Sequence, residues 1–423
     1  MFAGLAAAVL PALFAQPRLY TVPDAVAHGI SAAPPVSFEP FSALSPATRT
    51  TWQTLAAAHD GHESVYASPV FFDALSDTEA PDHLVIAATP DSKRGVQGIA
   101  ALRKKALQLD PHGLAGRLLT RRLAVWGVLG SAPLMRESSG GAASIAGFIA
   151  ALAEAPGRFD ALELQSLEVG SPTWQAVFES DAVRAQFVAY LPNGIRNCHQ
   201  TPLPDTVEAY LAQYPRKKRY NLSRQLRQIG ENLGGPPTVV PLTDIATLDT
   251  LFDAVAQIGG GGGAVLSRAE YASLARQGLL LNFVVQAGGA PIAVVLGIPS
   301  GSVYRINRVL YAHSLAPYSP GTSTLHLFNE WIIKDGRFKV VDFGFGEPGR
   351  TYSSSNRMVQ RARVMLLRRT LPNRIAITLH RAVVALEKCG RTLLAHAESL
   401  RGRTRAFTRR KSPPATAAAD EAN

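Results

Sequence analysis

The stretch that decides the fold is residues 290–350, which reads APIAVVLGIPSGSVYRINRVLYAHSLAPYSPGTSTLHLFNEWIIKDGRFKVVDFGFGEPGR. Two apolar runs flank the turn pair Ser300 and Gly301, so they predict a β-hairpin. After a loop that ends in Ser-Pro-Gly, apolar residues recur at helical spacing and predict a helix from near Thr322 to Gly336. Residues 338–343 then predict a short strand that runs into an acidic, glycine-rich turn. The expected order is strand, strand, loop, helix, strand.

The loop before this helix has the features of an anion site. A helix start exposes backbone N–H groups without intrahelical acceptors and the positive end of the helix dipole, and phosphate binds well there. Ser319, Gly321, Thr322 and Ser323 would supply amides and hydroxyls, and Gly321 would let a ligand approach the backbone closely. The alternative is that Ser319 or Thr322 only caps the helix.

Composition places the chain among globular proteins of more than one domain. Its 423 residues exceed what one core usually serves, and 47% hydrophobic with 18% charged residues is a globular composition. The two cysteines, Cys198 and Cys389, are too few and too far apart for a disulfide framework, which favours a reducing compartment. No spacing of metal-ligand residues occurs, so we predict no metal.

The net charge of +11 predicts an anionic partner, such as a nucleotide-bearing cofactor, nucleic acid or anionic lipid. Much of the excess lies in two clusters, residues 216–227 and residues 401–411. A solvated helix face and a disordered tail are the alternatives for these clusters. The apolar residues 1–16 lack a basic start and are too short to span a bilayer, so we expect a cytoplasmic protein without a transmembrane span, with a cleaved signal or anchor as the alternative.

The first half of the chain repeats the plan of the second. Two predicted strands, at 83–88 and 96–103, precede a helix that follows Gly141 and a strand at 159–164. The letters Gly-Arg-Phe occur just before the strand in both halves, at 157–159 and 336–338. A period of half the chain predicts two similar modules rather than a solenoid of short repeats.

With these motifs placed, the chain resembles two-module acyltransferases of the GNAT superfamily. It is most similar to the polysaccharide (cellulose) biosynthesis-related acetyltransferase group, which is related to the Fem-type aminoacyltransferases. The resemblance covers roughly residues 40–370. Four features carry it: the Ser68-Pro69 helix entry, the basic helix RKKRYNLSRQLRQ, the Tyr318-Ser319-Pro320-Gly321 loop, and the Asp342-Phe343-Gly344-Phe345-Gly346 turn.

The resemblance implies an α/β (α+β) fold of two tandem GNAT-like modules. Each module would contain a mixed, mostly antiparallel sheet flanked by helices, and acyl-CoA would rest its pyrophosphate on the loop of residues 319–323. The implied divisions are a lead-in (1–35), the first module (36–200), a basic helical segment (201–236), the second module with the acyl-CoA site (237–371), a long C-terminal helix (372–400) and a basic disordered tail (401–423).

Two positions depart from the family pattern. Ala312 stands where the group commonly has an acidic residue, and Tyr352 is followed by Ser353 where the group often has lysine. The usual contact of that lysine to an acceptor or a phosphate is therefore missing from this chain.

Acyl transfer from a thioester needs a base for the attacking group and an acid for the leaving thiolate. Asp342 and Glu347 are the candidates for the base, because a carboxylate in a dry cleft can have a raised pKa. Tyr318 or Tyr352 is the candidate acid. The alternatives are that Asp342 caps the turn through the amide of Gly344 or Phe345, and that the tyrosines only pack.

Three function classes follow. The first is an acyl-CoA-dependent N- or O-acyltransferase that acts on a sugar, a polysaccharide precursor or a small amine. The second is a Fem-like transferase that takes its acyl group from aminoacyl-tRNA, with RNA phosphates on the basic segment 216–227. The third is an inactive binding protein that keeps the fold.

Overall fold

The computed structural model describes residues 36–91, 95–109, 121–136, 141–155, 157, 159–259, 265–345 and 355–383. The chain divides into two compact units. One unit, residues 28–106 and 124–369, contains almost all of the described helices and strands. The other includes the described residues 370–383, of which 371–383 are helical. The rest of the helix predicted to 400, the lead-in and the tail lie outside the described residues.

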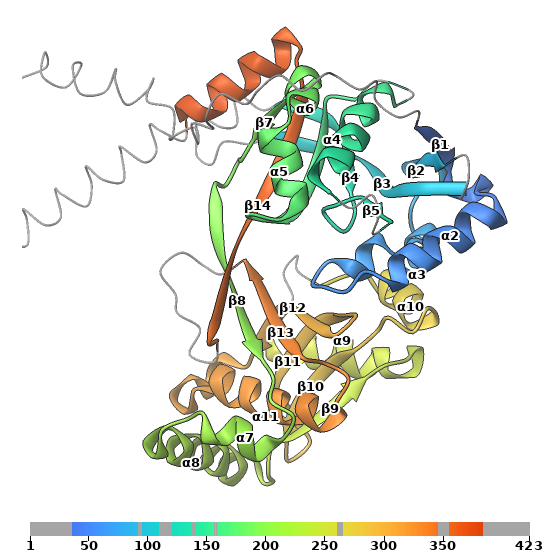
Figure 1. The fold of residues 1–423 in the computed structure, drawn as a ribbon. Helices are drawn as coiled ribbons and strands as arrows, with labels where there is room; N and C mark the ends of the chain where they lie inside the picture. The colour runs from blue at the N-terminus through green and yellow to red at the C-terminus, as the bar shows by residue number, and fades with distance from the viewer. Residues whose placement is uncertain are drawn as a thin grey trace, which may run out of the picture. The chain divides into compact units, whose positions relative to one another are not determined.

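The strands of the described chain form one mixed sheet of fourteen strands (Figure 1). Its main path runs β1-β2-β3-β4-β6-β14-β8-β13-β12-β11-β10-β9, with β5 beside β3 and β7 beside β14. The strands are β1 (Ser37–Pro40), β2 (Leu84–Asp91), β3 (Gly95–Leu109), β4 (Arg121–Val128), β5 (Leu134–Met135), β6 (Ala161–Glu168), β7 (Phe187–Tyr190), β8 (Ile195–Pro202), β9 (Thr238–Leu242), β10 (Asn282–Ala287), β11 (Ala290–Ser300), β12 (Val303–Tyr311), β13 (Val340–Phe345) and β14 (Arg357–Arg368).

Helices flank this sheet, as the sequence predicted. They are α2 (Pro46–Ala57), α3 (Pro69–Ser76), α4 (Ala142–Ala151), α5 (Pro172–Glu179), α6 (Asp181–Gln186), α7 (Val207–Ala212), α8 (Arg216–Leu233), α9 (Leu248–Ile258), α10 (Arg268–Arg276) and α11 (Pro320–Asp335). Two 3₁₀ turns, η2 (Ser64–Ala67) and η8 (His313–Tyr318), matter for the site. None of the helices in the described ranges is long and apolar enough to cross a lipid bilayer.

The two halves repeat one topology, as expected. In the first, the β2–β3 hairpin precedes β4, α4 and β6, and β4 pairs in parallel with β6. In the second, the β11–β12 hairpin precedes α11 and β13, and β12 pairs in parallel with β13. Each half therefore contains a parallel strand pair joined by a helical crossover within an otherwise largely antiparallel sheet.

Two elements of the second half begin two residues away from their predicted starts. Helix α11 begins at Pro320 rather than near Thr322, because proline suits the first helical position, where its missing N–H costs nothing. Its last residue is Asp335, and Gly336, the predicted stop, follows as the C-cap with a left-handed φ of 75°. Phe328 and Ile332 of α11 are fully buried in the core of this half. Strand β13 begins at Val340 rather than at residue 338.

Strand β14 joins the two halves. It comes after β13 in sequence, yet it lies between β6 and β8, and β8 pairs in turn with β13 (Figure 1). Only residues 364–367 of β14 form an apolar run, because its first half mixes charged, polar and apolar residues. The predicted boundaries of the modules stay a prediction. Strand β14 comes late in the sequence, yet it pairs with β6 of the first half as well as with β8.

Candidate active site

The two parallel strands β12 and β13 pair briefly and then separate. Their register joins Val303 to Val340, Tyr304 to Val341 and Arg305 to Asp342. Beyond these pairs β12 continues to Tyr311, whereas β13 pairs with β8 on its other side. We call the opening beyond Arg305 and Asp342 the β12–β13 fork. Strand edges at such a fork leave backbone donors and acceptors without a ladder partner, so they are available to a ligand.

A β-bulge marks the same point on β12. Its pairing with β11 joins Ile306 to Gly297 and Arg308 to Leu296, so Asn307 has no paired residue. The Asn307 side chain is exposed and hydrogen-bonds to the side chain of Tyr66, which comes from η2 in the first half of the chain. Bulges commonly occur where a strand must present a group to an active site.

The predicted anion-binding residues lie together at the start of α11. Ser319 adopts a left-handed conformation (φ 51°), and its side chain makes no capping hydrogen bond. Ser319 therefore occupies the N-cap position without capping through its side chain, and Thr322 lies inside the helix. The Thr322 and Ser323 amides both donate to the Ser319 carbonyl, at 3.1 and 3.2 Å.

Three polar groups of this first turn have no protein partner among the described residues. The amide of Gly321 has no backbone acceptor. The hydroxyls of Ser323 and Thr324 are buried, in residues with 0% exposure, and neither makes a hydrogen bond. Buried hydroxyls are normally satisfied. Of the three groups, only the amide of the partly exposed Gly321 lies in a residue that a ligand can reach, and its position at the positive helix end suits an anion.

Asp342 lies at the base of the fork and is completely buried. It accepts hydrogen bonds from the Gly344 amide (2.6 Å) and the Gln200 side chain (2.7 Å), and it forms an ion pair with Arg361 (2.7 Å). Burial opposes its ionisation, but the hydrogen bond and charge of Arg361, with the other two donors, outweigh burial and lower the pKa of Asp342. The predicted raised pKa is wrong, because Arg361 on β14 supplies a buried positive charge. The predicted turn contact with Gly344 is confirmed.

Residues from the first half of the chain complete the surroundings of the fork. Glu63, beside η2, forms a buried ion pair with Arg305. The Arg305 guanidinium also lies over the ring of Tyr66, 5.4 Å from its centroid. Burial raises the pKa of the Tyr66 hydroxyl, so that it keeps its proton at neutral pH. Two segments far apart in sequence thus place a protonated hydroxyl and a paired arginine at the fork.

His62 precedes this group and is held uncharged. Its Nε2 lies 3.3 Å from the Ser166 carbonyl, to which it donates. Burial first, and then the charges of Arg361 and Arg305, lower its pKa to about 3, although Asp342 opposes this shift. The unfolded chain, in contrast, binds a proton at His62 near the ordinary pKa of about 6.5.

This difference predicts a pH effect on stability. Since the unfolded state takes up the proton and the folded state does not, His62 lowers stability as the pH falls from about 6.5 toward 3. His62→Leu should therefore make the free energy of unfolding less dependent on pH over that interval, as measured by urea denaturation at several pH values. A slope in His62→Leu equal to that of the wild type would contradict the assignment.

The other predicted catalytic residues lie apart from this cluster or outside the described chain. Tyr318 is half-buried in η8 and packs against a core cluster that includes Ile229 and Leu315. Glu347 and Tyr352 lie outside the described residues, as does Ser353. The sequence reasoning missed His62, Glu63, Tyr66, Arg305 and Arg361. Charged residues inside otherwise apolar strands, as at Arg305 and Arg361, were the available signal.

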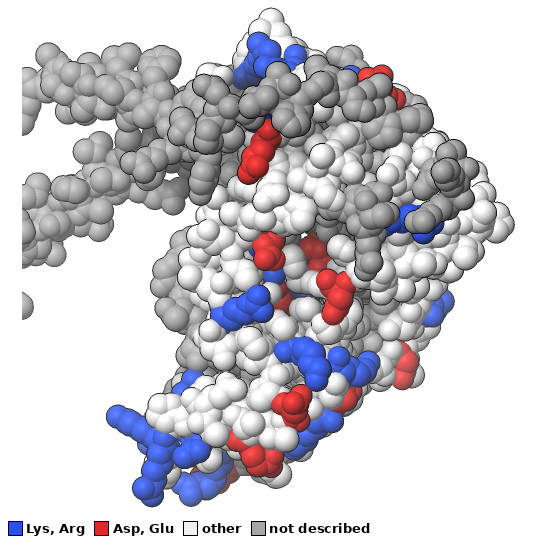
Figure 2. Space-filling view, viewed as in Figure 1, with Lys and Arg blue, Asp and Glu red and all other residues white. Residues whose placement is uncertain are grey.

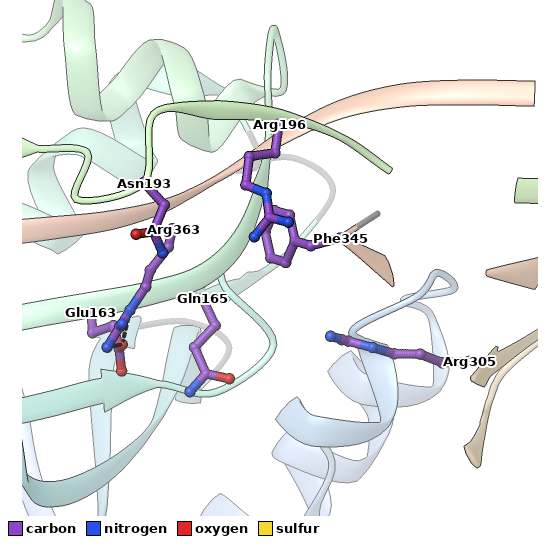
Figure 3. Close-up of a pocket in the computed structure, with 7 residues that line it drawn as sticks. All are labelled: Glu163, Gln165, Asn193, Arg196, Arg305, Phe345 and Arg363. Atoms are coloured by element: carbon purple, nitrogen blue, oxygen red, sulfur yellow. Dashed lines mark hydrogen bonds and ion pairs between the residues drawn. The ribbon is translucent and has the colours of Figure 1, made fainter. Parts of the chain in front are cut away.

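A cavity of about 370 Å³ lies next to the fork (Figure 3). Figure 2 shows a hollow on the face seen in Figure 1, with acidic and basic side chains inside it. The cavity is lined by Glu163 and Gln165 of β6, Asn193, Arg196 of β8, Arg305 of β12, Phe345 of β13 and Arg363 of β14. Its volume is in the range of small-molecule sites. The described residues contain no cluster of side chains that could hold a metal ion.

Comparison with known proteins agrees with this geometry. Residues 216–352, which include the fork and α11, match the model of the Acetyltransferase (GNAT) domain family. Over this segment the chain is therefore similar to GNAT acetyltransferase domains. No curated protein matches the sequence.

Among solved structures, the chain shares its fold with FemX, at a TM-score of 0.54 and 11% identity over 78% of this chain and 98% of FemX. Weaker similarity links it to L-PGS from Bacillus licheniformis, at a TM-score of 0.44 and 14% identity over 80% of this chain and 97% of that one. A tandem GNAT protein from the clavulanic acid biosynthesis pathway matches at a TM-score of 0.43 and 12% identity, over 78% of this chain and 98% of that one.

Proposed function

We propose that the protein transfers an acyl group from acyl-CoA to an amine or hydroxyl of a sugar, a polysaccharide precursor or a small amine. The observation that carries the proposal is the β12–β13 fork with the start of α11 after it. A splayed pair of parallel strands can accept an extended thioester arm, and the following helix start can accept its diphosphate. The GNAT domain matched over residues 216–352 supports the same reaction class.

The residues at the start of α11 fit a diphosphate. The unpartnered amide of Gly321 and the buried hydroxyls of Ser323 and Thr324 are donors without acceptors. Ser319 and Thr322 are at least partly exposed and can add hydroxyl donors at the rim. In this proposal Ser319, Gly321, Thr322 and Ser323 hold the coenzyme, and the coenzyme supplies the acyl thioester.

In the reaction the acceptor nitrogen or oxygen bonds to the acyl carbon, and the carbon–sulfur bond breaks. The acceptor loses a proton and the thiolate gains one. We assign proton donation to the Tyr66 hydroxyl, because it keeps its proton and contacts the bulged Asn307 at the fork. Tyr318 and Tyr352 stay alternative donors, and Glu347 stays the proposed base. Asp342 is assigned a positioning role, because an ion-paired carboxylate with a lowered pKa is a weak base.

Mass analysis of protein purified without added ligand tests the donor. Bound coenzyme A supports the proposal, and titration with acetyl-CoA should then give saturable binding and release of free thiol with a suitable acceptor. Co-purified tRNA instead of coenzyme A would favour aminoacyl-tRNA as the donor. Neither ligand, together with no thiol release from any acyl-CoA, would indicate a non-catalytic protein.

One observation favours the aminoacyl-tRNA alternative, namely the exposed basic face of α8. Its exposed basic side chains are Arg216, Lys217, Arg219, Arg224 and Arg227, and Arg227 forms an ion pair with the exposed Glu231. Figure 2 shows basic residues gathered over this helix. Such a face binds phosphates with a strong dependence on salt.

Charge reversal on α8 separates the two donors. With acyl-CoA as donor, Lys217→Glu combined with Arg224→Glu should leave the dissociation constant for acetyl-CoA within about two-fold, because these exposed residues lie on α8 and not at the fork. Isothermal titration measures this constant. With tRNA as donor, the same change should weaken tRNA binding by about ten-fold or more at low salt. A large loss of acetyl-CoA affinity would contradict the placement of the coenzyme at α11.

A further inference from the structure

We propose that Asp60 and Ser300 are positioning residues for the transfer. They hold residues 60–66, which we call the Tyr66 segment, against the turn between β11 and β12. The segment in turn sets the Tyr66 hydroxyl at the fork. This inference rests on the proposed acyl transfer, in which Tyr66 gives its proton to the leaving sulfur. The two residues act through Tyr66 and contact neither the coenzyme nor the acceptor.

The first contact lies at the tip of the β11–β12 hairpin. One carboxylate oxygen of Asp60, Oδ1, accepts a hydrogen bond from the Ser302 amide at 2.9 Å, and Oδ2 accepts one from the Ser302 hydroxyl at 2.6 Å. Burial opposes the ionisation of Asp60, but the two bonds from Ser302, with the Gly61 amide and the charge of His59, outweigh burial and lower the pKa of Asp60. Asp60 is therefore a carboxylate at neutral pH and can accept both hydrogen bonds.

Gly301, at the tip of the same hairpin, lets this carboxylate come close to the turn. Its φ of 57° is left-handed, which suits glycine. A Cβ added at Gly301 would also overlap Oδ1 of Asp60. The glycine that forms the turn therefore also leaves the space that Asp60 occupies.

The second contact is made by Ser300, the last residue of β11, which is fully buried. Its hydroxyl donates to the Gly61 carbonyl at 2.6 Å and accepts a hydrogen bond from the Val65 amide at 3.1 Å. The Ser64 hydroxyl lies 3.1 Å from the same oxygen. One side chain of β11 thus binds the backbone near both ends of the Tyr66 segment. Because Val65 directly precedes Tyr66, this contact fixes the position from which the tyrosine side chain extends.

The end of the segment contacts the fork. Glu63 pairs with Arg305, and the Arg305 guanidinium lies over the Tyr66 ring. Burial raises the pKa of Tyr66, and the hydrogen bond with Asn307 partly opposes that shift. A hydrogen bond has this effect when it is donated to the phenolic oxygen, because it then favours the ionised form. Asn307 is therefore the donor, and the Tyr66 hydroxyl can give its own hydrogen to another atom.

Proton transfer depends steeply on where the donor stands. A misplacement of about 1 Å can cost about 100-fold in rate. The Tyr66 segment, β11 and β12 belong to the same compact unit, and side chains at two successive points of the hairpin hold the segment there. Loss of either contact should therefore displace Tyr66 and leave the coenzyme site at α11 unchanged.

Fluorine NMR of the protein labelled with 3-fluorotyrosine tests the contacts without any substrate. The Tyr66→Phe variant identifies the Tyr66 resonance among the eleven tyrosines. Asp60→Ala and Ser300→Ala should each shift this resonance, whereas Asp249→Ala should leave it in place. Asp249 is the matched control, because it is also an exposed aspartate that accepts a hydrogen bond, in its case from Arg268. An unchanged Tyr66 resonance in Asp60→Ala would overturn the inference, and this variant decides alone if the buried Ser300→Ala does not fold.

Kinetics test whether Asp60 acts through Tyr66. The assay is thiol release from acetyl-CoA with glucosamine, which carries an amine and hydroxyls, as acceptor. Asp60→Ala should lower kcat by about ten-fold or more and leave the dissociation constant for acetyl-CoA within about two-fold. Asp60→Asn should recover most of the rate, because its amide oxygen can still accept a hydrogen bond from the Ser302 amide.

The same substitution in a Tyr66→Phe background gives the sharpest comparison. Asp60→Ala should have little further effect there, because the group that it positions is already missing. An equal loss of kcat in both backgrounds would show that Asp60 does not act through Tyr66.

The outcomes separate this inference from the function on which it rests. Failure to bind any acyl-CoA would remove the proposed function, and the fluorine spectra would still decide whether Asp60 and Ser300 hold Tyr66. Thiol release that stays at the wild-type rate in Asp60→Ala would overturn the positioning role and leave the transferase intact.

Discussion

Gly321→Asp should weaken coenzyme A binding by about 100-fold or more while the protein stays folded. The new carboxylate would stand in the first turn of α11, where the proposal places a diphosphate, and like charges at close range repel strongly. The same carboxylate favours the helix itself, because an acidic residue near a helix N-terminus interacts well with the dipole. Stability should therefore stay level or rise slightly while affinity falls, which a general folding defect cannot produce.

Gly321→Ala is the matched control. A Cβ at this position would meet the Tyr311 ring at 3.6 and 3.7 Å, which are ordinary van der Waals contacts. The alanine variant should therefore bind acetyl-CoA within a few-fold of wild type. Isothermal titration and thermal denaturation of the three proteins give the comparison. Equal affinity in the aspartate variant and wild type would show that the diphosphate lies elsewhere.

Asp342→Asn should lower the free energy of unfolding by about 3–5 kcal/mol, the usual effect of removing one partner of a buried ion pair. Arg361 is only 1% exposed, and it would keep its charge without a carboxylate. The Gly344 amide would also lose a charged acceptor. Urea denaturation measures the change. A loss below about 1 kcal/mol would mean that Asp342 and Arg361 do not interact as the structure shows.

The double variant Asp342→Leu with Arg361→Met tests whether the unpaired charge of Arg361 causes the loss of stability in Asp342→Asn. Replacing both charges by apolar groups removes the unpaired ion, so this protein should be more stable than the single variant. A pH series adds a second readout. Since the pKa of Asp342 is lowered in the folded state, its contribution is present above the ordinary value near pH 4 and is lost as the pH falls through the lower folded value. Asp342→Asn should lack this acid-side loss.

Single helices and hairpins could be predicted because the sequence pattern that specifies each of them lies within the element itself. The hairpin of β11 and β12 follows from two apolar runs around Ser300 and Gly301, and α11 follows from its apolar spacing and the Gly336 stop. The repeat of the two halves was visible for the same reason. The turn at Ser319 could be located as well, since the few residues that form it are enough to predict it.

The site could not be predicted in the same way, because its partners come from distant strands. Arg361 reaches Asp342 only because β14 lies beside β8, and β8 beside β13. A shift of one residue in either register would turn Arg361 to the opposite face. The sequence around Asp342 indicated burial, and burial by itself raises the pKa of a carboxylate. The charge that reverses this shift is that of Arg361, which lies on another strand, β14. Tyr66 and Glu63 reach the fork through a contact between the two halves of the chain.

Hydrogen exchange of individual backbone amides, with and without coenzyme A, tests the central claim most directly. The claim is that the β12–β13 fork and the first turn of α11 hold the coenzyme. Binding should slow exchange at Gly321, whose amide has no acceptor in the described chain, and at Asn307, which the β11 ladder skips. Coenzyme A that binds without protecting either amide, or that protects amides only in other parts of the protein, would contradict the claim.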